Sequence, residues 1–154
     1  MRSSKWRVFV MGLILGSIAF LAATTANAHV KVVPSESKPG ATETYKVTVP
    51  TEGKVPTVRV ELVVPRGVEL LSVADAVDPH EVRKGEGGAS VITWRGEILP
   101  GWAREYFFTA RNPRSETQIS WRAHQFFADG TAADWVDIPG SKRPAPVTKL
   151  VEAP

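Results

Sequence analysis

The sequence contains no cysteine, and its two methionines, Met1 and Met11, both lie close to the N-terminus. Without cysteine, the fold cannot be stabilised by disulfide bonds. The chain after residue 28 therefore has no sulfur ligand of any kind. Soft metal ions prefer thiolate and thioether sulfur, so this part of the chain does not suit them.

Excess charge of one sign is also missing from most of the chain. The whole sequence has 19 basic and 16 acidic residues and a formal net charge of +3. Arg2, Lys5 and Arg7 supply all of that excess, and the remaining residues are balanced. A balanced chain does not present the basic surface on which nucleic acids or anionic lipids bind. We therefore expect no nucleic-acid partner.

The first 28 residues have the pattern of a secretory signal peptide. Basic residues precede an apolar run from Val8 to Ala23. Small residues occupy positions 26 and 28, which form the recognition site of a signal peptidase. The run is shorter than the roughly 20 residues of a membrane-spanning helix. Cleavage after Ala28 is predicted, which places the mature chain in the periplasm or outside the cell with no stable membrane anchor.

The mature chain shows no credible amphipathic helix. In the stretch PTVRVELVVP, apolar residues alternate with polar ones, so Arg59 and Glu61 share the face opposite the core. Segments such as KPG, PRG and LPG separate this run from similar ones. The pattern predicts an all-β fold, an antiparallel immunoglobulin-like β-sandwich of about seven to nine strands. The residues expected to point into the core include Val58, Val60, Leu62 and Val64.

The sandwich is expected to span residues 29–140 as a single domain. The segment 141–154 is rich in proline. We expect it to form an extended, weakly packed tail.

Cleavage after Ala28 would make His29 the first residue of the mature chain. Its free α-amine and its imidazole Nδ1 can then close a six-membered chelate on one metal ion. An internal histidine cannot do this, because its backbone nitrogen is an amide. Nitrogen donors in a tetragonal arrangement suit Cu(II). The alternative is that His29 is merely the residue that follows a cleavage site.

Other candidate residues have both a structural and a ligand interpretation. Glu61 lies mid-strand, where its carboxylate either meets solvent or supplies an oxygen ligand. Trp135 follows a turn, and tryptophans in sandwiches usually pack in the core. His80 and His124 are ordinary hydrogen-bonded histidines or, alternatively, a second imidazole ligand.

Five segments in order resemble the YcnI-like copper-binding domain over nearly the whole mature chain. They read AHV, PSESKPG, PTVRVELVVP, LPGWAREYFFTARNP and AHQFFADGTAADWVDIPG. The resemblance implies an extracytoplasmic β-sandwich that binds Cu(II) through a monohistidine brace. It assigns the amine and imidazole to His29, the carboxylate to Glu61 and an indole packed against the site to Trp135. Gln125 matches a recurrent family position without an assigned role.

The sequence and the resemblance together predict a copper-binding protein and not an enzyme. It would carry or sequester Cu(II), with the copper ion and copper-handling proteins of the cell envelope as partners. Many relatives have a C-terminal transmembrane helix that this sequence lacks, so no membrane tethering is expected. One alternative is a copper monooxygenase-like enzyme, or a CopC-like carrier, in which His80 or His124 supplies a second imidazole. Another is a metal-free secreted interaction domain.

Overall fold

The computed structural model describes residues 29–152, so the predicted signal peptide lies outside the described residues. Twelve strands and one short 3-10 helix, η1 (Glu86–Gly88), make up the regular structure of this part. No helix within residues 29–152 is long and apolar enough to cross a bilayer. The strands are β1 (Lys31–Val33), β2 (Glu36–Ser37), β3 (Thr42–Pro50), β4 (Thr57–Val64), β5 (Glu69–Val73), β6 (His80–Lys84), β7 (Ser90–Ile98), β8 (Ala103–Arg111), β9 (Gln118–Ser120), β10 (Arg122–Phe127), β11 (Ala132–Trp135) and β12 (Val147–Leu150).

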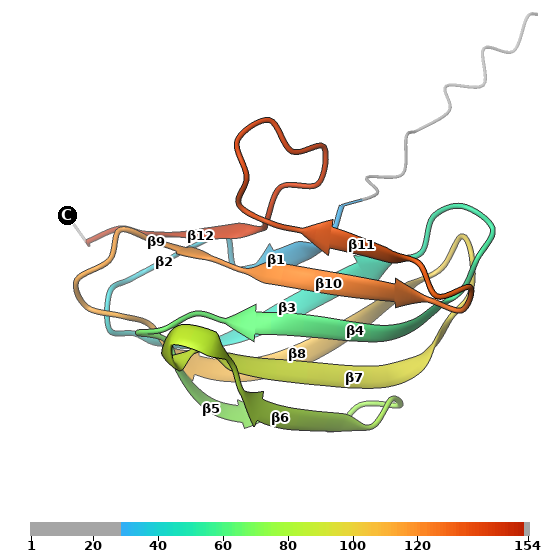
Figure 1. The fold of residues 1–154 in the computed structure, drawn as a ribbon. Coiled ribbons are helices and arrows are strands. Elements are labelled where there is room, and N and C mark those ends of the chain that lie inside the picture. Colours follow the sequence, from blue (N-terminus) through green and yellow to red (C-terminus); the bar gives the residue numbers. More distant parts are fainter. Residues whose placement is uncertain (1–28, 153–154) are drawn as a thin grey trace, which may run out of the picture.

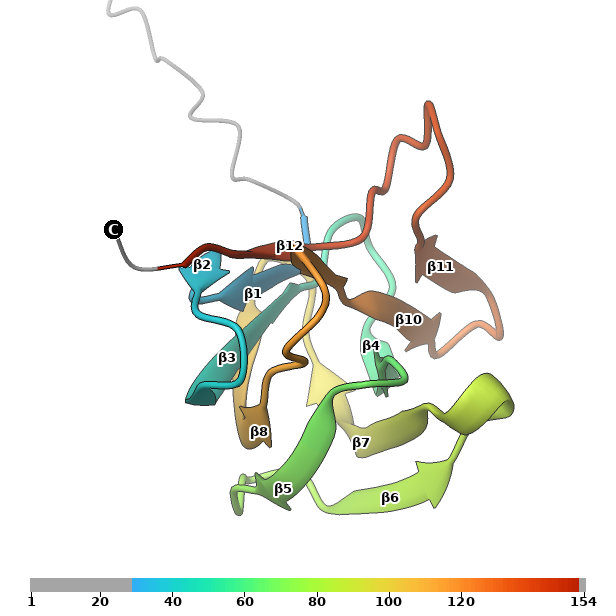
Figure 2. The ribbon, with the colours of Figure 1, turned by 90° about the vertical axis from the view of Figure 1, so that its left-hand side faces the viewer.

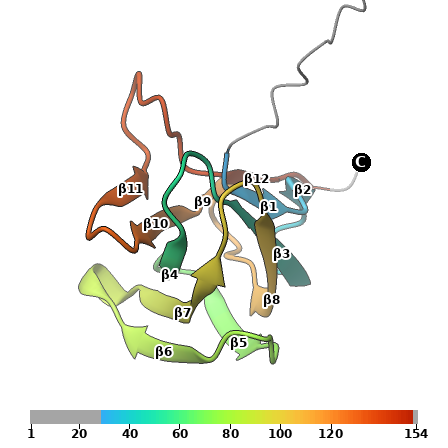
Figure 3. The ribbon, with the colours of Figure 1, turned by 90° about the vertical axis from the view of Figure 1, so that its right-hand side faces the viewer.

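Two antiparallel sheets form the layers of a sandwich (Figure 1). One has four strands in the order β1-β3-β8-β5, and the other has five in the order β11-β10-β4-β7-β6. Figures 2 and 3 show the layers side by side from the two ends. A small third sheet, β2-β12-β9, lies towards the left in Figure 1 and contains a parallel pair, β2 with β12. The all-β sandwich is confirmed, with nine strands in its two main layers.

The core between the layers is rich in aromatic side chains. Both sheets contribute them, because alternate residues of each strand point into the space between the layers. Tyr45 stacks on Phe108, and Trp94 stacks on Tyr106. The largest fully buried side chains are Trp94, Trp121, Tyr45, Tyr106 and Phe108.

Strand β4 follows the predicted alternation except at its start. Val60, Leu62 and Val64 are buried as expected, whereas Val58 is 38% exposed, so the prediction for Val58 is wrong. The pairing of β4 with β7 shifts register between Thr57 and Arg59. This irregularity changes the face on which residues lie. Thr57, and not Val58, is therefore the buried residue at this end of the strand.

The C-terminal segment is more tightly packed than its composition suggested. Residues Val147–Leu150 form β12, which pairs with β2 on one side and β9 on the other. Thr148 is fully buried, and its hydroxyl accepts a hydrogen bond of 3.0 Å from Trp121 Nε1. The expectation of a weakly packed tail is thus wrong for these residues, because long-range pairing supplies the order that proline-rich sequence does not.

Candidate metal centre

His29 and Trp135 lie against each other although they are far apart in the sequence. His29 precedes β1, and Trp135 is the last residue of β11. Their ring centroids are 5.5 Å apart with an interplanar angle of 61°, an edge-to-face arrangement. Trp135 is only 5% exposed, whereas His29 is exposed. The imidazole therefore covers a buried indole and still faces solvent.

Strand pairing explains which segment His29 approaches. Lys31 of β1 pairs with Thr48 of β3 in an antiparallel register. Continuing that register by two residues places His29 opposite Pro50, the last residue of β3. The loop that follows Pro50 carries Glu52. Glu52, two residues beyond Pro50, is a carboxylate that the sequence pattern did not single out.

A cavity of about 240 Å³ lies between the loop after Pro50 and the end of β11, and His29 borders it only through its contact with Trp135. Its lining includes Glu52, Gln125, Trp135 and Arg143. Glu52 is exposed and forms no ion pair with any described residue. Its carboxylate is therefore available as an oxygen ligand beside the indole that His29 covers.

Gln125 fixes the start of the loop that carries Glu52. This buried side chain donates from Nε2 to the carbonyl oxygen of Pro50 at 2.9 Å and to Thr57 Oγ1 at 2.6 Å. Thr51 Oγ1 lies 2.7 Å from the same threonine hydroxyl. Both ends of the loop are thus held to one buried amide. The sequence pointed to position 125, but only the structure supplies its role.

Glu61 lies on the other face of the five-stranded sheet. It aligns across the strands with His124 and Thr93, and its carboxylate lies 3.2 Å from Arg83 Nη2 and 3.6 Å from Arg59 Nε. The prediction that Glu61 faces away from the core agrees with its neighbours Val60 and Leu62, which are buried.

Trp135, in contrast, belongs to the inner face. It pairs with Ala123, which pairs with Leu62, and all three residues are buried. The structure therefore brings Trp135 to His29 and leaves Glu61 among arginines on the outer face.

Neither of the other histidines approaches His29. His124 lies on the outer face, with Nδ1 2.7 Å from Asp134 Oδ1. His80 begins β6, at the edge of the sheet opposite β11, and four strand spacings amount to roughly 19 Å. Within residues 29–152, no three His, Cys, Asp or Glu side chains cluster closely enough to hold a metal ion. A metal site at His29 would therefore need more than one donor from that residue.

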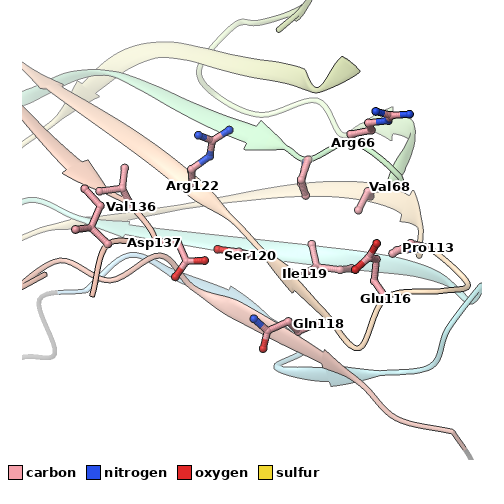
Figure 4. Close-up of a pocket in the computed structure, with 12 residues that line it drawn as sticks. Arg66, Val68, Pro113, Glu116, Gln118, Ile119, Ser120, Arg122, Val136 and Asp137 are labelled. Carbon is pink, nitrogen blue, oxygen red and sulfur yellow. The ribbon is translucent and has the colours of Figure 1, made fainter. Parts of the chain in front are cut away.

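A larger cavity lies elsewhere in the described part of the chain. It measures about 540 Å³ and is lined by segments around Arg66, Ile119, Arg122 and Asp137 (Figure 4). No histidine lines either this cavity or the 240 Å³ cavity, but the residues of the smaller one include Trp135, on which His29 packs. At the His29 end, Trp135 Nε1 is buried without a hydrogen-bond partner, as is Ser120 Oγ, which lines the 540 Å³ cavity. Such unsatisfied groups are uncommon in a packed interior.

The architecture defines an immunoglobulin-like β-sandwich. A crystal structure of an uncharacterized protein from Nocardia farcinica, described as revealing an immunoglobulin-like fold, superposes with a TM-score of 0.68 at 20% identity, covering 81% of this chain and 99% of that one. A non-cellulosomal cohesin from Archaeoglobus fulgidus gives a TM-score of 0.50 at 12% identity, covering 80% and 91%. These likenesses concern the fold alone.

Sequence comparison then identifies the family. The family model described as "Domain of unknown function (DUF1775)" matches residues 29–150. "Copper-binding protein CutI" of Bacillus subtilis (strain 168) is 32% identical over 145 residues, which cover 91% of this chain and 70% of the relative. The chain belongs to this DUF1775 family of YcnI-like domains, which confirms the resemblance found in the sequence.

Proposed function

We propose that this protein binds Cu(II) outside the cytoplasm, as a carrier or sequestering protein in copper handling. The observation that carries the proposal is the position of His29, which packs on the buried indole of Trp135 at the end of the sandwich where Glu52 lies. The name of the B. subtilis relative supports copper as the metal. Partners would be the copper ion and copper-handling proteins of the cell envelope.

The donor set suits Cu(II). After cleavage, the amine and Nδ1 of His29 would supply two nitrogen ligands in one chelate. Glu52 would supply a carboxylate oxygen, in place of Glu61, which lies on the opposite face of the sheet. Nitrogen and oxygen donors favour Cu(II) over Cu(I), which prefers sulfur. Trp135 would form a wall of the site and exclude water from one side.

Processing after Ala28 is an essential part of the proposal. The signal-peptide pattern ends there, and the region matched by the family model begins at His29. The mature protein would then be periplasmic or secreted. Binding is favoured over monooxygenase chemistry because neither His80 nor His124 lies where it could add a second imidazole.

The proposal is tested by comparing protein that begins at His29 with the same protein acetylated at the His29 amine. Removing the partner of a metal ligand already costs roughly 10–100-fold in affinity. Converting the amine ligand itself into an amide should cost at least about 100-fold. Cu(II) affinity is measured against a competing chelator at fixed pH. Equal affinities in the two proteins would rule out the brace.

A pH series on the processed protein gives an independent readout. The amine and the imidazole must both be unprotonated to chelate, so copper binding should release protons and weaken as the pH falls. Protein acetylated at the His29 amine is the control. Its residual binding should show a smaller pH dependence, because it has no free α-amine.

A further inference from the structure

The 540 Å³ cavity of Figure 4 lies where the five-stranded sheet splits. Arg122, the first residue of β10, pairs with Val63 near the end of β4. Beyond Val64 the chain leaves the sheet in a turn, in which the amide of Val68 donates to the carbonyl oxygen of Pro65 at 3.2 Å. Strand β9, which precedes β10, pairs instead with β12. Within the described residues, no other strand fills the space that β4 leaves beside β9.

Four charged side chains line this cavity, and none of them forms an ion pair with a described residue. They are Arg66, Glu116, Arg122 and Asp137. Figure 4 shows the two arginines along one side of the cavity and the two carboxylates along the other. All four side chains are exposed, so the folded chain does not need to pair them. Both kinds of charge are therefore available to one ligand.

The inner part of the cavity combines apolar surface with an unused hydroxyl group. Pro113 and Ile119 are buried and line it together with Val136. Ser120 Oγ, which also lines it, is buried without a hydrogen-bond partner. A polar ligand in the cavity would supply the missing partner. The volume also falls within the range of about 300–1,000 Å³ that is usual for small-molecule sites.

We propose that this cavity binds an apolar α-amino acid, either free or as a short peptide with free ends. Its carboxylate accepts hydrogen bonds from Arg66 and Arg122, because the planar guanidinium fork matches carboxylate geometry. Its ammonium group donates to Glu116 and Asp137, and its apolar side chain packs on Ile119. A ligand of one charge would leave the opposite pair unused, whereas a zwitterion matches both. The inference does not depend on copper binding, because no histidine lines the cavity.

Isothermal titration calorimetry of processed, metal-free protein tests the class of ligand. The probes are L-leucine and the dipeptide leucyl-leucine, and tighter binding of one of them identifies the source. A chelator in the buffer prevents copper from linking the probe to the protein. N-acetylleucine lacks the ammonium group and leucinamide lacks the carboxylate, so each should bind about tenfold more weakly than leucine or not at all. Absence of saturable binding by both probes, or equal binding of the blocked forms, would overturn the proposal.

Substitutions in the lining test the position of the ligand. Arg122→Gln and Asp137→Asn should each weaken binding about tenfold or more, because each removes a charged partner. Both side chains are exposed and unpaired among the described residues, so both variants should fold, which urea unfolding checks. Arg114→Gln is the matched control, because Arg114 is exposed and does not line the cavity. Unchanged affinity in both lining variants, or an equal loss in Arg114→Gln, would overturn the site.

Discussion

The imidazole of His29 lies edge-on to the indole of Trp135, with 5.5 Å between the ring centroids. Val30 and Val32, which follow His29, are 3% and 4% exposed. The backbone is therefore anchored in the core directly after the histidine. This arrangement places the first residue of the predicted mature chain on a fixed part of the sandwich, where a chelate would meet a preformed surface.

Glu52→Gln and Glu61→Gln form a matched pair that tests which carboxylate serves the site. Glu52→Gln should weaken Cu(II) binding by roughly 10–100-fold, because it removes the oxygen donor beside Trp135. Glu61→Gln should leave the affinity unchanged, since Glu61 faces Arg59 and Arg83 on the outer face. Competitive chelator titration of both processed variants measures the difference. The opposite ranking would return Glu61 to the site.

Gln125→Leu should disturb the loop that carries Glu52. The substitution removes the side-chain donor to the carbonyl of Pro50 and leaves the hydroxyl of Thr57 with Thr51 as its remaining partner, which should cost about 1–3 kcal/mol of unfolding free energy. Cu(II) affinity should fall as well, because the loop loses its anchor. Gln118→Leu, at an exposed position on β9, should change stability by no more than about 0.5 kcal/mol.

Urea unfolding gives the stability, and copper titration is carried out where both variants are folded. Full copper affinity in folded Gln125→Leu would show that the site does not depend on this anchor.

Thr148→Val tests the contribution of β12. The change keeps the size of the side chain but removes the hydroxyl that accepts from Trp121 Nε1 and donates to the carbonyl of Pro34. We expect a loss of about 1–3 kcal/mol in the free energy of unfolding, because the buried Trp121 Nε1 and the partly buried Pro34 carbonyl both lose this partner. Thr42→Val, at an exposed position, is the control. Equal stability of the two variants in urea would contradict a structural role for this strand.

Two buried tyrosines should make the protein sensitive to alkali. Burial raises the pKa of Tyr45 to about 12. Burial and the hydrogen bond to Asp78 raise the pKa of Tyr106 in the same direction. An unfolded tyrosine titrates near 10. The folded state therefore holds these protons more tightly, and stability is fully present below about pH 10 and is lost as the pH rises towards the folded pKa.

The shift at Tyr45 corresponds to a loss on the order of 3 kcal/mol once both states are ionised. Urea unfolding from about pH 8 to pH 11.5 should show this decline. Tyr45→Phe should be less stable at neutral pH, because Asn112 Oδ1 loses its donor, but should decline less steeply. An unchanged slope in Tyr45→Phe would show that other groups cause the alkaline sensitivity.

The sequence alone determined the fold class, the inward position of Val60 and Leu62, and the outward position of Glu61. These are local properties, because residues two apart on a strand share a face whatever the strand pairs with. The order of segments also identified the family, which is now shown by the match over residues 29–150. The end of the signal-peptide pattern singled out His29 without any structural information.

Only the tertiary structure decided what lies beside His29. The alternation in β4 puts Glu61 on one face of its strand but does not say which face Trp135 shares, and the register of three strands puts the two residues on opposite faces. Glu52 stands in a loop without periodicity, so its position depends on the Gln125 side chain, which is bonded to both ends of that loop. Similarly, the burial of Thr57 in place of Val58 and the order of β12 come from register and pairing with distant segments. Such contacts join residues far apart in the chain, and their energies exist only once the sheets have formed.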